Sequence, residues 1–349
     1  MQKTVLVCLS FLYLNISAQD TVKIKTALTS EQEAENAYNA GLESMIKKDF
    51  NMAIEQFTKA ISFKANFDKA FCNRGAARYE SKSYDASIED YNKALAINPI
   101  STDAFFGKAQ SFYAINKKDS CVAYLSKTTF IDETYSKAFY LNGQINFESG
   151  NYKYAILEYD KAIANKKDYA YAYNDRASAK KQLGDEAGAI VDYEKAISID
   201  PKLFFAYNNL GSCKRSKGDN AGAIDAYNKA ISIKPDYYIA LNNRGTAKLN
   251  LNDFAGAIAD FDGALKIKPN YILAMNNMAS AYIKKKDYKA ATEWANKAIQ
   301  IDAKLAAAYV NRGIAKQMLK DEEGACADWK KSVEYGSVEG KRFSSGFCD

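Results

Sequence analysis

The sequence repeats itself with a period of 34 residues, and this period limits most strongly how the chain can fold. Residues 238–271 align without a gap on residues 204–237, and further shifts by 34 in both directions give nine abutting copies. These copies are 34–67, 68–101, 102–135, 136–169, 170–203, 204–237, 238–271, 272–305 and 306–339. A unit this short buries its apolar face only by stacking on neighbouring copies. We therefore expect one uninterrupted array of repeats.

Small and bulky side chains recur at fixed positions of each copy. With each copy numbered from 1 to 34, position 8 is always Gly or Ala, position 20 is nearly always Ala, and positions 4 and 24 are mostly aromatic. Positions 4, 8 and 11 form one stripe at helical spacing, and positions 20, 24 and 27 form a second. Small residues in such stripes allow two helix axes to approach to ~8–10 Å. Each copy is therefore predicted to be a helix–turn–helix.

The turns and helix ends carry matching signals. In the turn, Gly184 precedes Asp185, so that the glycine can end one helix in a left-handed conformation and the aspartate can cap the next. Proline, which cannot continue a helix, occurs in this chain only at position 32, as Pro99, Pro201, Pro235 and Pro269. The third copy departs most from the pattern, with Lys117 and Lys118 in its turn, and we expect that turn to be the least regular.

The repeat resembles the tetratricopeptide repeat, which has small residues at positions 8, 20 and 27, aromatic residues at 4 and 24 and proline at 32. The resemblance covers residues 34–339 and implies an all-α, right-handed superhelical solenoid of nine helix–turn–helix units. Residues 340–349 are too few for a tenth copy and are predicted to form a C-terminal cap. Phe343 and Phe347 lie four residues apart and would cover the last repeat.

The N-terminal stretch is typical of an exported protein. Residues 1–18 combine one lysine, an apolar run and small residues at the end, which predicts a signal peptide cleaved after Ala18. The run is too short to indicate a membrane span, and a buried first helix is the alternative. Residues 19–33 are read as a linker and helix start, with Ser30 and Glu33 as a capping box. We expect a periplasmic or extracellular protein of a Gram-negative bacterium.

The composition argues against catalysis. The chain has no histidine, which excludes Ser-His-Asp machinery and histidine-bound metals. The carboxylates that recur occupy the cap position 16, as Asp49, Asp185, Asp219, Asp253, Asp287 and Asp321. We therefore expect no enzyme activity, no cofactor and no metal. The 48 Lys and Arg residues are interspersed with 42 Asp and Glu, so a nucleic-acid partner, which favours a clustered basic surface, is not expected.

Two cysteines near the C-terminus are predicted to pair. Cys326 lies in the second helix of the last repeat and Cys348 lies in the cap, at similar distances on either side of the turn near Ser337. An exported protein permits such a disulfide, which would close a loop of ~20 residues and stabilise the cap by ~3 kcal/mol. Two buried thiols are the alternative. Cys72, Cys121 and Cys213 show no ligand-like spacing.

The resemblance also implies a binding groove, because in this family the first helix of each repeat lines the concave face. The stripe opposite the core is aromatic in repeats 1–4, with Tyr38, Tyr79, Phe106, Tyr113, Tyr140 and Phe147. It is rich in amides in repeats 5–9, with Asn174, Asn208, Asn209, Asn242, Asn243, Asn276, Asn277 and Asn311. Asparagine both donates and accepts hydrogen bonds and suits an extended peptide backbone, while exposed aromatic residues suit binding hot spots. Solubility or local packing is the alternative role.

The expected function is therefore a non-catalytic scaffold that binds a protein or extended peptide in this groove. The alternative is a structural component of a cell-envelope complex that acts through its convex face or its termini. The arginines that recur at position 7 are expected to pair with nearby acidic groups, and capture of an anion is the alternative; they are Arg74, Arg176, Arg244 and Arg312.

Overall fold

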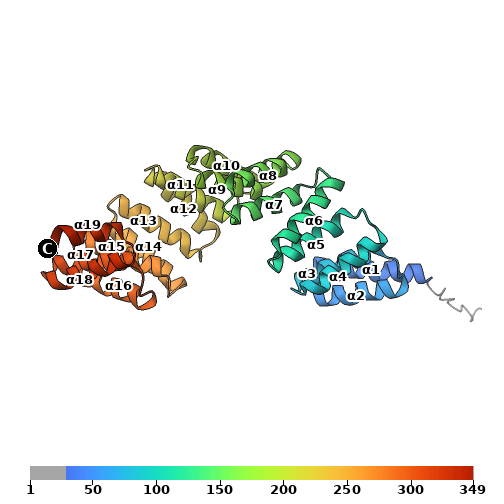
Figure 1. Ribbon diagram of the computed structural model, residues 1–349, viewed down its shortest axis with the longest axis horizontal. Coiled ribbons are helices and arrows are strands. Elements are labelled where there is room, and N and C mark those ends of the chain that lie inside the picture. The colour runs from blue at the N-terminus through green and yellow to red at the C-terminus, as the bar shows by residue number, and fades with distance from the viewer. Residues whose placement is uncertain (1–28, 349) are drawn as a thin grey trace, which may run out of the picture. The chain divides into compact units, whose positions relative to one another are not determined.

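The computed structural model describes residues 29–348, and the regular structure within that range is entirely α-helical (Figure 1). The first helices of the repeats are α1 (Ser30–Ile46), α3 (Asp68–Glu80), α5 (Thr102–Ala114), α7 (Ser136–Glu148), α9 (Ala170–Gln182), α11 (Phe204–Ser216), α13 (Tyr238–Asn250), α15 (Ile272–Lys284) and α17 (Ala306–Met318). The second helices are α2 (Phe50–Phe63), α4 (Tyr84–Ile97), α6 (Lys118–Ile131), α8 (Tyr152–Asn165), α10 (Glu186–Ile199), α12 (Asn220–Ile233), α14 (Phe254–Ile267), α16 (Tyr288–Ile301) and α18 (Glu322–Glu334). A last helix, α19, spans Val338–Phe347.

The helices keep the register of the sequence period. From α3 to α17 each first helix begins 34 residues after the previous one, and from α2 to α18 the second helices do the same. Successive helices pack on one another within each of the units described next. The prediction of an all-α array of helix–turn–helix repeats is therefore confirmed.

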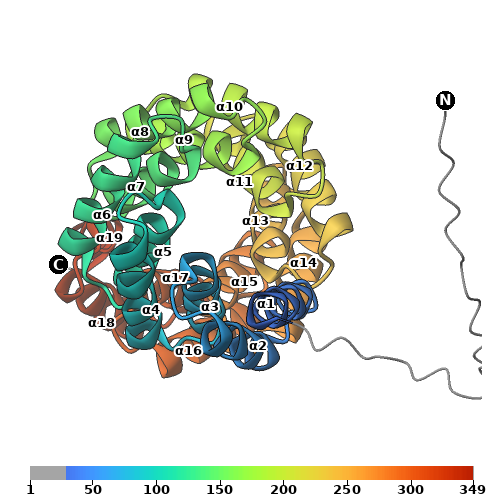
Figure 2. The same ribbon diagram turned by 90° about the vertical axis from the view of Figure 1, so that its right-hand side faces the viewer.

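The described chain divides into two compact units, residues 29–117 and residues 118–348. The division falls in the turn of the third repeat. This turn has the same backbone hydrogen bonds as the turn of the second repeat, and Asn116 takes the same left-handed conformation as Lys82, so the expectation that it is the least regular turn is wrong. In the second unit, Figure 2 shows first helices such as α9, α11 and α13 on the inner side of the stack. Second helices such as α10, α12 and α14 lie on the outer side. The candidate site lies on first helices of this second unit.

The small residue at position 8 exists because an aromatic ring lies directly against it. A Cβ added to Gly245 would lie 2.6 Å from the Cε1 atom of Phe261, which is the aromatic residue at position 24 of the same repeat. Gly143 meets Tyr159 in the same way, at 2.5 Å. Phe261 and Tyr159 are fully buried. Glycine at position 8 thus lets the two helices of a repeat close over a ring, as the alternation of small and bulky residues predicts.

The turns and caps form largely as the sequence predicts. Gly184 adopts a φ of 83°, and the Asp185 side chain accepts a hydrogen bond from the Gly188 amide at the start of α10. All six aspartates at position 16 cap a helix in this way. The first capping box differs from the prediction, because it consists of Thr29 and Gln32 instead of the expected residues one position later.

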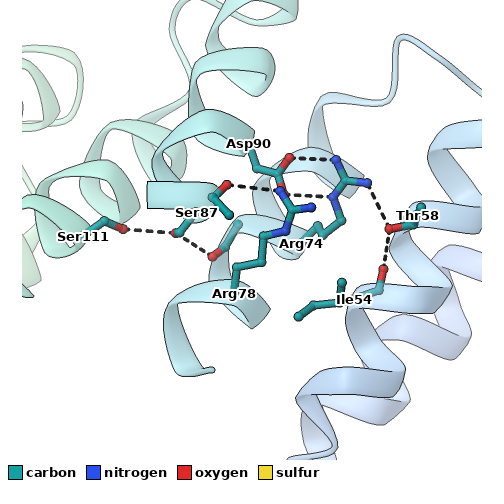
Figure 3. Close-up of polar contacts among 9 residues, drawn as sticks. Ile54, Thr58, Arg74, Arg78, Ser87, Asp90 and Ser111 are labelled. Carbon is teal, nitrogen blue, oxygen red and sulfur yellow. Dashed lines mark hydrogen bonds and ion pairs between the residues drawn. The ribbon is translucent and has the colours of Figure 1, made fainter. Parts of the chain in front are cut away.

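The position-7 arginines pair with buried aspartates at position 23. In Figure 3 the Arg74 guanidinium makes two hydrogen bonds with the Asp90 carboxylate, 2.8 Å from Nε to Oδ2 and 2.7 Å from Nη2 to Oδ1. Arg78 binds the same carboxylate at 2.8 Å, and Arg74 also donates to the Thr58 hydroxyl of the preceding repeat. The arginine therefore ties the second helix of its own repeat to the second helix of the repeat before it. This confirms the expected pairing with acidic groups.

The same arrangement recurs in repeats 5, 7 and 9, while repeats 6 and 8 fill the site with apolar residues. Arg176, Arg244 and Arg312 bind Asp192, Asp260 and Asp328, respectively. In repeat 6 the equivalent residues are Leu210 and Ala226, both of which are buried. An ion pair and an apolar pair therefore occupy equivalent places in one stack, as expected if either solution satisfies the site.

The C-terminal helix covers the last repeat. The Phe343 ring stacks on Trp329 with 5.2 Å between ring centroids, and Phe347 lies 5.8 Å from the same indole. A disulfide joins Cys326 to Cys348, with 5.5 Å between their Cα atoms. The aromatic cap and the covalent link thus fix the same helix to α18.

Candidate functional site

The predicted groove residues link neighbouring first helices through hydrogen bonds. The side chain at position 6 of one repeat donates to the side chain at position 5 of the repeat before it, 35 residues earlier. Asn243 Nδ2 donates to Asn208 Oδ1 at 2.9 Å, and Asn277 Nδ2 donates to Asn242 Oδ1 at 2.9 Å. Asn209 reaches Asn174 at 3.3 Å, and Asn311 reaches Asn276 at 2.9 Å. We call this row of amides, which runs from Asn174 to Asn311, the amide ladder.

Tyrosines take part in the same kind of contact between position 5 of one repeat and position 6 of the next, which we call the joint. In the first unit Asn73 Nδ2 donates to the Tyr38 hydroxyl at 2.7 Å. In the second unit the Tyr140 hydroxyl donates to Asp175 Oδ2 at 2.6 Å. Both pairs join position 5 of one repeat to position 6 of the next. The aromatic stripe and the amide stripe of the sequence therefore both contribute side chains to the same kind of contact between repeats.

This contact buries part of the stripe that the sequence places opposite the core. Asn174, Asn208 and Asn242 are buried, and Phe106 is buried as well. Position 5 points toward the neighbouring first helix, because adjacent first helices approach closely enough for side chains at positions 5 and 6 to meet. Solvent access at the ladder therefore falls mainly on position 6, where Asn209, Asn243, Asn277 and Asn311 are partly buried.

Two of the remaining predicted aromatic residues, Tyr79 and Phe147, pack against the second helix of their own repeat. Tyr79 lies edge-on to Tyr84, with 5.6 Å between ring centroids, and Phe147 lies edge-on to Tyr152 at 5.3 Å. Tyr113 is partly buried. Tyr38, Tyr79, Phe106 and Tyr113 belong to the first unit, while Tyr140 and Phe147 belong to the second.

Some polar atoms of the ladder remain available to a ligand. Among the described residues, Asn277 Oδ1, Asn311 Oδ1 and Asn276 Nδ2 have no hydrogen-bond partner, and none of them is a buried unsatisfied atom. Amide groups with spare donors and acceptors at regular spacing can pair with the backbone of an extended chain. The ladder can therefore join repeats and still offer hydrogen bonds outward.

An apolar row runs beside the ladder on the same helices. Position 2, three and four residues before the ladder positions and hence on the same helical face, holds Tyr171, Phe205, Ile239 and Leu273 in repeats 5–8. Tyr171 and Leu273 are 48% and 54% exposed, and the Tyr171 and Phe205 rings lie 5.7 Å apart. We call these four residues the apolar row. The signal was present in the sequence as a non-polar residue at position 2 of four successive repeats.

A small cavity lies where the ladder ends. It has a volume of about 160 Å³ and is lined by Gln144, Phe147, Glu148, Tyr159, Asp175 and Ser178 of α7, α8 and α9. Asp175 occupies position 6, where the following four repeats have asparagine. Burial raises the pKa of its carboxyl group, although hydrogen bonds from Tyr140, Asn174 and Gln144 oppose the shift. Sequence reasoning missed Asp175, whose signal is one charged residue in a column of amides.

Other kinds of site find little support in residues 29–348. Within that range no helix is both long and apolar enough to cross a bilayer. No cluster of three or more histidine, cysteine or carboxylate residues in the same range is placed to hold a metal ion.

Comparisons with known proteins agree with this geometry. Models described as tetratricopeptide repeat match residues 34–67 and 170–203, residues 68–100 and 204–237, and residues 242–306. Together these segments cover more than half of the chain. No protein of curated function matches the sequence.

Solved structures share the fold at low sequence identity. A chain of the APC/C hetero-tetramer Cut9–Hcn1 matches with a TM-score of 0.59 and 14% identity, over 93% of this chain and 78% of that one. A tetratricopeptide repeat protein from Parabacteroides merdae has a TM-score of 0.58 and 17% identity, over 71% and 99%. PilF of Pseudomonas aeruginosa has a TM-score of 0.53 and 20% identity, over 62% and 98%. With the matched segments and the helical register, these likenesses lead to one conclusion: the chain belongs to the tetratricopeptide repeat family.

Proposed function

We propose that this protein is a non-catalytic scaffold and that the first-helix face of residues 118–348 binds an extended segment of a protein partner. The observation that carries the proposal is the apolar row lying beside the amide ladder. Exposed Tyr171 and Leu273 supply apolar contact area, and the spare amide atoms supply hydrogen bonds to a backbone. An extended segment presents both kinds of group at regular intervals along its length.

The face has the chemistry of a recognition surface. Large exposed apolar side chains cost solvation free energy unless a partner covers them, and aromatic residues contribute strongly to interface energy. The amides add little sequence preference, because any backbone offers N–H and C=O groups. Specificity for one partner sequence must then come from the apolar row and from the cavity at the end of the ladder.

A matched pair of double variants tests the proposal. Tyr171→Ser with Leu273→Ser removes the exposed members of the apolar row and leaves the ladder intact. Tyr154→Ser with Val191→Ser removes side chains of similar exposure, 66% and 63%, from the second helices α8 and α10. In cross-linked pull-downs from intact cells, the first pair is expected to reduce partner recovery several-fold and the second to leave it unchanged. The reverse result would instead favour assembly through the outer second helices.

We also infer that the chain is exported to the periplasm or the cell exterior. The signal-like pattern of residues 1–18 lies outside the described residues, and the disulfide between Cys326 and Cys348 supports the same conclusion, because disulfides persist in oxidising compartments. The test is N-terminal sequencing of the protein from fractionated cells. Export predicts that the mature protein begins at Gln19 in the envelope or medium fraction, whereas an intact N-terminus in the cytoplasmic fraction would contradict it.

A further inference from the structure

The joint between Tyr140 and Asp175 carries a negative charge that the joint itself does not need. The first unit contains the neutral counterpart, in which Tyr38 pairs with Asn73. Asparagine also occupies position 6 in the four repeats after Asp175. An amide oxygen can also accept a hydrogen bond from a tyrosine hydroxyl, so the contact can form without a charge. Linking two repeats therefore does not explain why position 6 carries a charged residue in this repeat.

No cation of the described chain neutralises Asp175. Its hydrogen-bond partners are Tyr140, Asn174 and Gln144, all of which are uncharged. The cations nearest to it in sequence are committed elsewhere, because Arg176 binds Asp160 and Asp192 and Lys180 binds Asp192. A partly buried carboxylate without a counter-ion is costly, and a cation that enters the site removes that cost.

The cavity beside the carboxylate has the size and lining for one side chain. A cavity of ~150 Å³ holds a ligand as large as benzene, and this one measures about 160 Å³. Phe147 gives its wall an aromatic surface, against which the aliphatic stem of a lysine or the plane of a guanidinium packs favourably, and the fully buried Tyr159 forms its base. Ser178 and Gln144 add polar atoms to the wall.

We propose that the cavity at Asp175 binds one lysine or arginine side chain of the partner segment. The proposal rests on the proposed function of the first-helix face and adds a specificity-determining position to it. The partner's cation pairs with the Asp175 carboxylate while its stem lies against Phe147. The rest of the segment follows the amide ladder and the apolar row from this anchor.

The test uses the full mature chain and a phage-displayed library of random decapeptides. Wild-type protein is expected to enrich peptides with Lys or Arg at one fixed position. Asp175→Asn, which restores the residue found at position 6 of later repeats, is expected to lose that preference. Asp262→Asn removes an exposed carboxylate of α14 and is expected to keep it. Thermal unfolding of each variant verifies that it is folded.

A double-mutant cycle then assigns the contact. Replacing the selected Lys or Arg by norleucine is expected to weaken binding to wild type by about tenfold or more and to leave binding to Asp175→Asn unchanged. Phe147→Leu gives a second variant, expected to weaken the basic peptide and the norleucine peptide alike, because norleucine keeps the aliphatic stem that lies against Phe147. If wild type enriches peptides without any basic preference, the cavity proposal is wrong and the scaffold function stands. If no peptide is enriched, both are wrong.

Discussion

The Arg244 guanidinium binds the Asp260 carboxylate through two parallel hydrogen bonds, 2.6 Å from Nη2 to Oδ1 and 2.9 Å from Nε to Oδ2. Asp260 is buried on α14, and Lys248 binds its Oδ2 at 2.9 Å. Arg244 also donates to Asn228 of the preceding repeat at 2.7 Å. One side chain thus joins three helices.

Asp260→Ala is expected to lower the free energy of unfolding by about 2–3 kcal/mol, because it leaves two cations without their shared partner. The value is below that of a fully buried pair, since water reaches both cations. The measurement is urea unfolding followed by circular dichroism.

The double variant Arg244→Leu with Asp260→Ala reproduces the residues of repeat 6, where Leu210, Lys214 and Ala226 occupy the same positions. It is expected to recover most of the loss. The control, Asp262→Ala, removes an exposed carboxylate paired with Lys266 and is expected to change stability by less than about 0.5 kcal/mol. A double variant no more stable than Asp260→Ala would show that the ion pair is not interchangeable with an apolar pair.

Gly245→Ala is expected to destabilise the protein by about 1–3 kcal/mol, because the new methyl group meets the Phe261 ring and the Ala257 carbonyl oxygen, 3.1 Å away. Gly263→Ala is the matched control in the same repeat. Its Cβ would approach nothing closer than Leu241, at 3.7 Å. Since glycine is unfavourable within a helix, this second variant is expected to gain about 0.5–1 kcal/mol. Equal effects of the two variants in thermal unfolding would contradict the packing described at position 8.

The state of the cysteines can be counted directly. In the mature chain that begins at Gln19, unfolded and unreduced protein is expected to expose three reactive thiols, those of Cys72, Cys121 and Cys213. Five reactive thiols would show that the bridge does not form. In the folded protein, burial raises the pKa of the Cys72 and Cys121 thiols to about 12, so we expect slow labelling near neutral pH. Cys326→Ser with Cys348→Ser is expected to lower stability by about 3 kcal/mol.

The contribution of Asp175 to the free energy of unfolding is expected to fall as the pH rises. Burial raises the pKa of its carboxyl group in the folded state, so the folded protein binds that proton more tightly than the unfolded chain does. Its contribution to stability is therefore present below the unfolded pKa of ~3.9 and is lost as the pH rises through the folded pKa. The titratable groups around it are Tyr140, Tyr169 and Tyr193, whose pKa values are themselves raised by burial, and Glu148 of the same cavity.

The measurement compares unfolding free energies of wild type and Asp175→Asn from pH 4 upward. Asp175→Asn is expected to gain on wild type as the pH rises, whereas Asp262→Asn controls for the loss of one surface charge. A constant difference between wild type and Asp175→Asn would contradict the raised pKa.

The fold could be predicted in detail because its determinants are local. Each determinant acts within a single repeat, as do the spacing of Gly245 and Phe261 and the turn formed by Gly184 and Asp185. The pattern also occurs nine times in the sequence, so that each copy supports the interpretation of the others. The pairing of Arg244 with an acidic group was also predictable, since a long cation at a core-facing position needs a partner.

The site was harder to predict because its contacts lie between repeats. The Asn208 side chain could point toward solvent or toward Asn243 of the next repeat. Which of the two occurs depends on the offset between adjacent first helices, and the 34-residue period alone does not give that offset. The direction of a side chain at position 5 is therefore decided by stacking. Asp175 can be recognised as unusual only once the asparagines at position 6 are known to link adjacent repeats. Without that knowledge it is one of many acidic residues on helix surfaces.

The most direct test of the scaffold function places a photo-reactive amino acid at Ser280, which lies on α15 one helical turn after Asn276 and Asn277. The matched position is Glu293, which is exposed on α16 of the same repeat. Illumination of intact cells is expected to cross-link a partner segment to the chain at position 280 and not to the chain at position 293. A partner cross-linked only from position 293, or from neither position, would contradict binding at the first-helix face.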